Sequence, residues 1–235
     1  TSATLDNETV YSNQPIIVNA GSKLMFNAPA NGARIYLAVH GGFVFTKGRL
    51  QKNDLLLTAQ NFNYHFEGVG QLHALTTGWT ANTGEFYRSN IIRCIQGPNF
   101  NVLSKKEIEQ FENKRFEIDL QSNRMGFRLK SDPICHTITP ELLSTAVTRG
   151  TLQLTPAGQL IVLMADHQTT GGYPRIGTVI SADMASLAQM PIGSSFGIKW
   201  IDIQEAERLL LQQETNLQQL ENACKFRLQE YFSEK

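Results

Sequence analysis

The sequence has no excess charge of either sign, no long apolar run and few cysteines, and each absence excludes a class of protein. Its 235 residues carry 21 lysines and arginines against 21 aspartates and glutamates. The chain therefore lacks the positive charge by which proteins bind nucleic acid or an anionic membrane. No apolar run approaches the roughly 18 to 20 residues of a membrane-spanning helix. Three widely separated cysteines without a CxxC pair favour a reduced, cytoplasmic protein over a disulfide-bonded one.

The signatures of common metal and nucleotide sites are also absent. The sequence has no GxxxxGK[ST] phosphate loop, no GxGxxG turn and no HExxH pair. The five histidines are scattered along the chain, and scattered histidines are more often structural or exposed than metal ligands. We therefore expect no metal in this chain and no hydrolytic triad that works alone.

The first part of the chain is built from short apolar runs separated by glycine, proline and asparagine. These runs lie at residues 15–21, 23–29, 33–43 and 54–60. Closely spaced apolar runs with turn residues between them are typical of antiparallel β-structure. We predict a strand in each of the four.

The middle of the chain predicts more strands, with two short helices among them. Strands are expected at 91–95, 114–120, 149–154, 160–165, 175–180 and 194–200. Pro156 and Gly158 predict a type I turn that joins 149–154 to 160–165 in a hairpin. Ser104 and Glu107 resemble a capping box, and Ser181 is a plausible cap for a helix that stops before Pro191.

Beyond Asp202 the pattern changes to one long helix without glycine or proline. Ile203, Leu210, Leu217, Cys224 and Tyr231 recur every seven residues, which predicts one buried face. Polar residues interrupt the alternate positions, so this helix could lie across the sheet or a partner, or pair with itself as a coiled coil.

A stretch rich in glycine, asparagine and threonine, residues 76–90, is the best candidate for a connection between two parts. We therefore divide the chain into an N-terminal β subdomain at 1–85, a β-barrel domain at 86–201 and a C-terminal helix at 202–235.

The first of two polar clusters, "QSNRMGFRLKS", contains Asn123, Arg124 and Arg128. In extended geometry the two arginines would share a face, because side chains alternate along a strand. Two guanidinium groups on one face can clamp a carboxylate or phosphate. The alternative is a pair of solvated surface arginines.

The second cluster, "MADHQTTGGYPRIG", lies between two apolar strands and offers carboxylate, amide, hydroxyl and guanidinium groups. Asp166 and His167 would point to opposite faces if the segment were extended, so they would not form a dyad. The glycine pair permits close approach of a ligand and backbone angles closed to other residues. The segment is either a site for a small polar amide or an ordinary hairpin loop. Its candidate binding residues are Gln168, Thr169, Thr170, Gly171, Gly172, Tyr173 and Arg175.

Three stretches carry a family resemblance: "ARIYLAVHGGF", "SNRMGFRL" and the long run from "GTLQLTPAGQ" to "AQMPIG". Together they resemble the allophanate hydrolase subunit 2 family. That family includes the C subunit of bacterial 5-oxoprolinase, the antagonist of a sporulation-kinase inhibitor, and part of the carboxyltransferase domain of urea carboxylase. Residues 1–13 do not match the family's usual opening motif, and we expect a fragment or a divergent member.

The resemblance implies a mainly β fold with a cyclophilin-like β-barrel, and a cytoplasmic hydrolase subunit that is not active alone. Its implied partners are a cyclophilin-like subunit 1 protein and a lactam-utilisation-type subunit. In the 5-oxoprolinase setting the complex uses ATP to open 5-oxoproline to glutamate. In the urea carboxylase setting it transfers a carboxyl group from carboxybiotin to urea, and biotin becomes the ligand. The third alternative is a regulatory protein without catalysis that binds a kinase-inhibitor partner.

For the enzyme hypothesis, the residues suggest a division of roles. Arg124, Arg128 or Arg175 would bind a substrate carboxylate or phosphate, and Asn123 would lie beside them. Gln168, Thr169 and backbone N–H groups near the glycine pair would hold a developing oxyanion. Asp166, the only carboxylate in its motif, would handle the proton.

Overall fold

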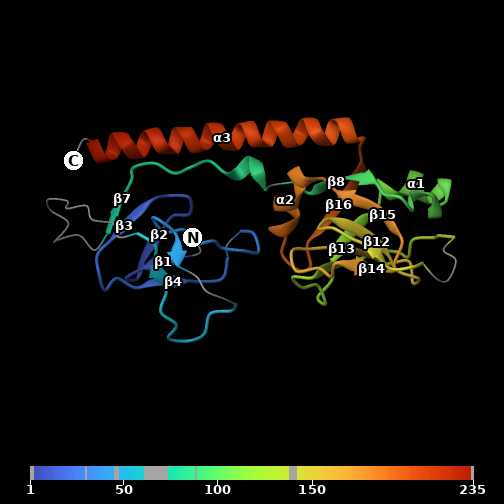
Figure 1. Ribbon diagram of the computed structural model, residues 1–235, viewed down its shortest axis with the longest axis horizontal. Coiled ribbons are helices and arrows are strands. Elements are labelled where there is room, and N and C mark those ends of the chain that lie inside the picture. Colours follow the sequence, from blue (N-terminus) through green and yellow to red (C-terminus); the bar gives the residue numbers. More distant parts are fainter. Residues whose placement is uncertain are drawn as a thin grey trace. The chain divides into compact units, whose positions relative to one another are not determined.

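The computed structural model describes residues 3–29, 31–44, 48–60, 74–87, 89–137 and 142–233 (Figure 1). Its contacts divide the chain into two compact units. The N-terminal unit comprises residues 1–30, 34–80 and 229–235, and the barrel unit comprises 31–33 and 81–228. The mainly β fold with a closed barrel and a long C-terminal helix is confirmed.

In the part of the N-terminal unit that the structure describes there are three small antiparallel sheets. β1 (Ala3–Leu5) pairs with β2 (Glu8–Val10) and β4 (Leu24–Phe26), β3 (Ile16–Val18) pairs with β7 (Ala74–Thr76), and β5 (Phe43–Val44) pairs with β6 (Leu57–Thr58). Asp6 and Asn7 join β1 to β2 with φ of 50° and 74°. Two consecutive residues with positive φ are typical of the tight turn that suits a twisted hairpin.

Two of the predicted N-terminal strands are mostly wrong. Residues 34–42 form no strand, and only Leu57–Thr58 pairs within 54–60. Gly41 and Gly42 have φ of 71° and 80°, which turns the chain just before β5. The apolar side chains that precede them are exposed, with Tyr36 at 78%, so burial does not hold this segment in a sheet.

The barrel unit is a closed barrel of seven strands in the order β10-β13-β12-β15-β8-β16-β9. β16 is parallel to β8, and every other neighbouring pair is antiparallel. Alternate side chains fill the interior, as at Ile92, Phe116, Leu152 and Ile198, all at most 2% exposed. The strand bounds are β8 Ile91–Gln96, β9 Arg115–Ile118, β10 Gly126–Lys130, β12 Thr151–Leu154, β13 Leu160–Leu163, β15 Arg175–Val179 and β16 Ser195–Trp200.

The turn between β12 and β13 forms as predicted. The Gly158 N–H donates to the Thr155 carbonyl at 2.9 Å, which places Pro156 second and Gly158 fourth in the turn. Gly158 has φ of 76°, and a Cβ there would lie 2.8 Å from the backbone of Ile134. Only glycine fits both demands.

The short helix η2 (Gly84–Phe86) precedes β8, the first barrel strand in the chain. The short helices that connect barrel strands are η3 (Phe100–Val102), α1 (Lys105–Phe111), η4 (Ser181–Asp183) and α2 (Met184–Ala188). Ser104 caps α1 by accepting from the Glu107 N–H at 3.1 Å, whereas the buried Glu107 carboxylate accepts from Lys114 and from the Cys135 N–H. The predicted Ser181 cap is wrong, because Ser181 lies inside η4 and makes no cap.

The long helix α3 spans Ile203–Ser233 (Figure 1, orange to red). The Asp202 carboxylate caps it by accepting from the Glu205 N–H at 2.7 Å. The predicted buried stripe is wrong at Ile203 and Leu217, which are 48% and 47% exposed, and no residue of α3 is fully buried. Within the barrel unit, Gln213 donates from Nε2 to the Ala182 carbonyl at 2.9 Å. No helix in the described part of the chain has the length and apolar character to cross a membrane.

Candidate functional site

Residues 164–174, the crossover segment, connect β13 to β15. β12 lies between these two strands and is antiparallel to both. β13 and β15 are therefore parallel, and the connection has to return along the barrel from one end to the other. Midway, β14 (Thr170–Gly171) pairs with β11 (Thr145–Ala146). Of the two alternatives for this segment, the ordinary hairpin loop is therefore wrong.

Gly171 is where the crossover segment packs most closely on the barrel. Gln153 of β12 is 2% exposed although its neighbours Leu152 and Leu154 fill the barrel interior, so Gln153 points to the opposite face. A Cβ on Gly171 would lie 2.3 Å from Gln153 Nε2. Neither Gly171 nor Gly172 has positive φ, so the expected special backbone angles are wrong. At Gly171 the packing against Gln153 leaves no room for a side chain, which explains the glycine there. At Gly172 no such restriction applies.

Arg124 and Asp166 form an ion pair at one end of the barrel. Arg124 Nε lies 2.8 Å from Asp166 Oδ2, and the two side chains are 80% and 46% exposed. The Asp166 N–H also donates to the Arg124 carbonyl at 2.9 Å. An ion pair this exposed contributes about 0–1 kcal/mol, so a competing anion can open it at little cost.

The predicted arginine pair on one strand face does not form. β10 begins at Gly126, so Arg124 lies in the preceding turn, and alternation along a strand does not relate it to Arg128. Asn123 holds this turn, because its Oδ1 accepts from the Met125 N–H at 2.8 Å. Asn123 therefore has a structural role in this structure.

Arg175 lies at the opposite end of the barrel from Asp166. It begins β15, whereas Asp166 follows the last residue of β13, and the two parallel strands separate these ends by roughly 10 Å at about 3.3 Å per residue. Arg175 Nη1 donates to the Ala146 carbonyl at 2.9 Å. This guanidinium ties the start of β15 to β11, and it does not join Arg124.

The remaining predicted residues lie along the exposed edge of the crossover segment. Asp166 lies in a turn that the His167 N–H closes on the Met164 carbonyl, so the extended geometry expected for this pair is wrong. His167 Nδ1 contacts the Gln168 carbonyl at 2.5 Å and Asp166 contacts Arg124, so no Asp–His dyad forms. Four side chains face solvent: Gln168, Thr169, Thr170 and Tyr173.

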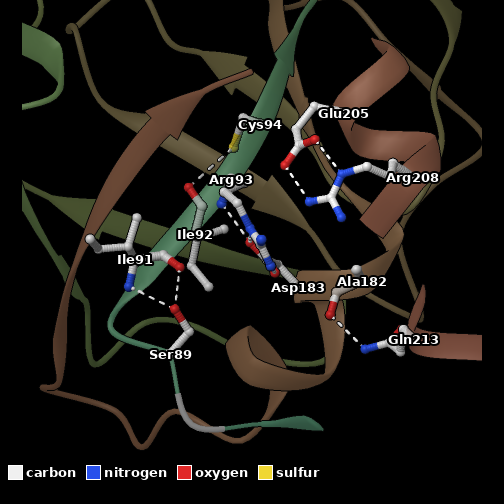
Figure 2. Close-up of polar contacts among 10 residues, drawn as sticks. All are labelled: Ser89, Ile91, Ile92, Arg93, Cys94, Ala182, Asp183, Glu205, Arg208 and Gln213. Atoms are coloured by element: carbon white, nitrogen blue, oxygen red, sulfur yellow. Dashed lines mark hydrogen bonds and ion pairs between the residues drawn. The ribbon is translucent and has the colours of Figure 1, made fainter. Parts of the chain in front are cut away.

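A second polar site, which sequence reasoning missed, lies around Arg93 of β8 and Asp183 of η4 (Figure 2). Asp183 is 2% exposed, and its carboxylate accepts three hydrogen bonds from Arg93. The donors are the backbone N–H at 2.7 Å, Nε at 2.9 Å and Nη2 at 2.5 Å. The hydrogen bond to Asp183 raises the pKa of Arg93. The available signal was a single arginine inside the apolar run "IIRCI".

Further charges surround this pair. Glu205 and Arg208, one turn apart on α3, form two hydrogen bonds of 2.7 and 2.8 Å (Figure 2). The hydrogen bond from Arg208 lowers the pKa of Glu205. Burial raises the pKa of the adjacent Cys94 thiol well above its usual range, which keeps that thiol neutral and unreactive. Among the described residues, no group of three or more histidines, cysteines or carboxylates could hold a metal.

A cavity of about 190 Å³ opens beside Arg93 and Asp183. Phe86, Ser89 and residues of η4 and α2 form one wall of the cavity. Residues of α3 between Leu209 and Asn216 form the other wall. All of these residues belong to the barrel unit. The site therefore brings together groups more than 100 residues apart in the sequence.

Comparison with known proteins identifies the family from the sequence. Residues 1–200 match the model of the carboxyltransferase domain, subdomain A and B. The chain is 33% identical to the C subunit of 5-oxoprolinase from Escherichia coli over 236 residues, and 30% identical to that of Haemophilus influenzae over 235 residues. These alignments cover 93% and 92% of the chain and 72% of each relative.

Two solved structures share the fold. The Kluyveromyces lactis urea amidolyase superposes with a TM-score of 0.78 at 19% identity, over 93% of this chain and 15% of that one. The urea carboxylase of the same yeast gives a TM-score of 0.73 at 19% identity, over 93% and 22%. The chain thus spans a small part of each of these larger enzymes, and at this identity the likeness concerns the fold alone.

Proposed function

The chain belongs to the carboxyltransferase domain family, subdomain A and B, and from this membership we propose that it is one of the subunits of a 5-oxoprolinase. In this proposal it works with a subunit 1 partner and a lactam-utilisation-type subunit to open 5-oxoproline to glutamate with ATP. The observation that carries the proposal is the 33% and 30% identity, over more than nine tenths of the chain, to two proteins named as the C subunit of 5-oxoprolinase.

The exposed ion pair at the barrel end supports a role in substrate binding. 5-Oxoproline carries a carboxylate, and a guanidinium binds carboxylates through two parallel hydrogen bonds. Arg124 is 80% exposed, and its guanidinium contacts Asp166 in an exposed pair. A substrate carboxylate would displace Asp166 at a cost of about 0–1 kcal/mol.

Displacement would leave the Asp166 carboxylate free beside the substrate. Ring opening breaks the lactam C–N bond, adds the oxygen of water to the carbonyl carbon, and puts a proton on the nitrogen. Asp166 would accept the proton of the attacking water. The exposed amide of Gln168 and the hydroxyl of Thr169 would hydrogen-bond the carbonyl oxygen as it gains charge.

Neither of the two polar sites described above suits ATP. The cavity beside Arg93 measures about 190 Å³, below the roughly 300 to 1,000 Å³ of pockets that hold drug-sized ligands. The crossover segment presents side-chain hydroxyls and amides and no glycine-rich phosphate cradle. We assign ATP to another subunit of the complex.

The site is tested by substitution in the assembled complex. Arg124→Ala removes a charge-assisted contact worth about 1.5–3 kcal/mol, so kcat/KM for 5-oxoproline is expected to fall about tenfold to a hundredfold. Arg49→Ala, which removes another exposed arginine in the other unit, is the matched control and should have no effect. Full activity in the double variant Arg124→Ala, Asp166→Ala would refute this site.

A second candidate, carboxyl transfer from carboxybiotin to urea, is supported by the description of the family as a carboxyltransferase domain. The ureido ring of biotin and the lactam ring both present a planar N–H and C=O pair, so the same polar edge would suit either. Supplying urea, bicarbonate, ATP, biotin and a biotin carboxylase distinguishes the candidates. Allophanate formation would favour the urea reaction, and glutamate formation from 5-oxoproline would favour the lactam reaction.

A further inference from the structure

We propose that the cavity beside the Arg93–Asp183 pair is a second binding site, for a small molecule that carries both a carboxylate and an amide. It is separate from the polar edge of the crossover segment. The proposal goes beyond the proposed reaction, because it concerns binding to this chain alone and needs no turnover.

The hydrogen-bonding groups of the pair indicate an anionic partner. The Asp183 carboxylate accepts three hydrogen bonds from Arg93. Its oxygens are therefore largely occupied, and little acceptor capacity remains for a cation in the cavity. Arg93 gives Nε and Nη2 to Asp183 and leaves Nη1, on a side chain that is 32% exposed. A guanidinium with remaining N–H groups binds a carboxylate.

The net charge around the cavity favours a small anion over a highly charged one. Arg93 and Asp183 balance each other, and Glu205 and Arg208 form a second balanced pair that acts on Arg93 through its field. A phosphate group with two negative charges would find no net positive field here. One carboxylate needs only the directed hydrogen bonds of Arg93.

The rest of the lining suits an amide with a short aliphatic part. Gln212 and Asn216 of α3 line the cavity with amide groups, and Ser186 adds a hydroxyl. The Gln212 Oε1 already accepts from Arg208 at 3.2 Å, which leaves its N–H₂ group as a donor for a ligand carbonyl. Phe86 and Leu209 provide apolar surface against which methylene groups can pack.

Size limits the ligand further. At about 190 Å³ the cavity is smaller than the roughly 300 Å³ at which pockets begin to take drug-sized molecules. An amino acid, a short amide or a lactam carboxylic acid fits this limit. The probe that matches every feature is 5-oxoproline, with 2-pyrrolidone as the same ring without the carboxylate.

The test is calorimetric titration of the full chain with 5-oxoproline and 2-pyrrolidone up to millimolar concentration. We expect 5-oxoproline to bind and 2-pyrrolidone to bind at least tenfold more weakly. Asn216→Trp fills the cavity and should weaken 5-oxoproline binding at least tenfold. Gln219→Trp places the same side chain at an exposed position of the same helix outside the cavity lining, and it should bind like the parent chain.

A milder pair keeps the test valid if the tryptophan variant does not fold. Gln212→Leu should weaken binding several-fold and Gln219→Leu should not. Absence of 5-oxoproline binding, equal binding of 2-pyrrolidone, or binding that Asn216→Trp leaves unchanged would overturn the proposal. Binding lost in Arg124→Ala but kept in Asn216→Trp would also overturn it, because the ligand would then occupy the crossover segment. Cavity binding without turnover in the complex would contradict only the proposed reaction.

Discussion

The substitution Asp183→Asn tests how the barrel is held together beside the cavity. It keeps the shape of the side chain but removes its charge and replaces one acceptor oxygen with a donor N–H₂ group. In the parent chain both oxygens accept from Arg93, one of them from two donors. In the variant, the side-chain N–H₂ group of the asparagine therefore lies opposite at least one N–H donor of Arg93, and no hydrogen bond can form there.

The expected loss follows from burial. Removing one partner of a buried ion pair costs about 3–5 kcal/mol. Arg93 is 32% exposed and Asp183 3% exposed at the side chain, so water can rehydrate part of the guanidinium, and asparagine keeps one acceptor. We therefore expect a loss of about 2–3 kcal/mol. With a urea m-value of about 1–3 kcal/mol per molar, the midpoint should fall by about 1 M.

The assay is urea unfolding followed by the fluorescence of Trp200. The chain has two tryptophans, and Trp79 belongs to the N-terminal unit, so the background Trp79→Phe leaves only the reporter in the barrel. Trp200 packs against Phe100 and Phe111 with ring centroids 4.8 and 5.1 Å apart. Its signal therefore reports unfolding of the barrel itself.

The matched control is Asp166→Asn, which removes the same charge from an exposed pair. Asp166 is 46% exposed and its partner 80%, so the expected loss is at most about 1 kcal/mol. If the two variants lose equal stability, or if Asp183→Asn loses less than about 1 kcal/mol, the buried pair does not have the structural role assigned to it.

Two further outcomes follow from space and burial. Gly171→Ala should lower the free energy of unfolding by about 1–3 kcal/mol through overpacking, since a Cβ would lie 2.3 Å from Gln153 Nε2. Gly172→Ala, whose nearest neighbours lie at 3.5 Å, should lose no stability in the same urea experiment. Equal losses would contradict the packing described for the crossover segment. The exposed Cys135 should react at once with a thiol reagent at pH 8. The buried Cys94, whose pKa is raised by burial, should react only when the chain unfolds. Early labelling of Cys94 in a mass-spectrometric time course would show that the barrel interior is open.

The sequence predicted those elements that depend on residues close together in the chain. The hairpin turn at Pro156 and Gly158, the Ser104 cap and the glycine-free helix from Ile203 all rest on neighbouring residues, and each is present. The strand expected at 33–43 forms only at Phe43, because Ile35, Tyr36 and Leu37 lie exposed. An apolar run predicts a strand only where other parts of the protein bury its side chains.

The candidate site was harder to predict because its geometry depends on long-range pairing. The crossover segment looked like a loop, since nothing local shows that β12 separates β13 from β15. Arg124 and Asp166 were both named from the sequence, but their contact joins residues 42 apart. Arg93 and Asp183 are 90 residues apart, and only the closed barrel brings them together.

The measurement that tests the central claim most directly is reconstitution of the reaction. The chain is mixed with a subunit 1 protein and a lactam-utilisation-type subunit, and glutamate formation from 5-oxoproline is followed with and without ATP. The proposed function predicts glutamate only when ATP and all three proteins are present. No glutamate from the complete mixture, or the same rate when this chain is left out, would contradict it.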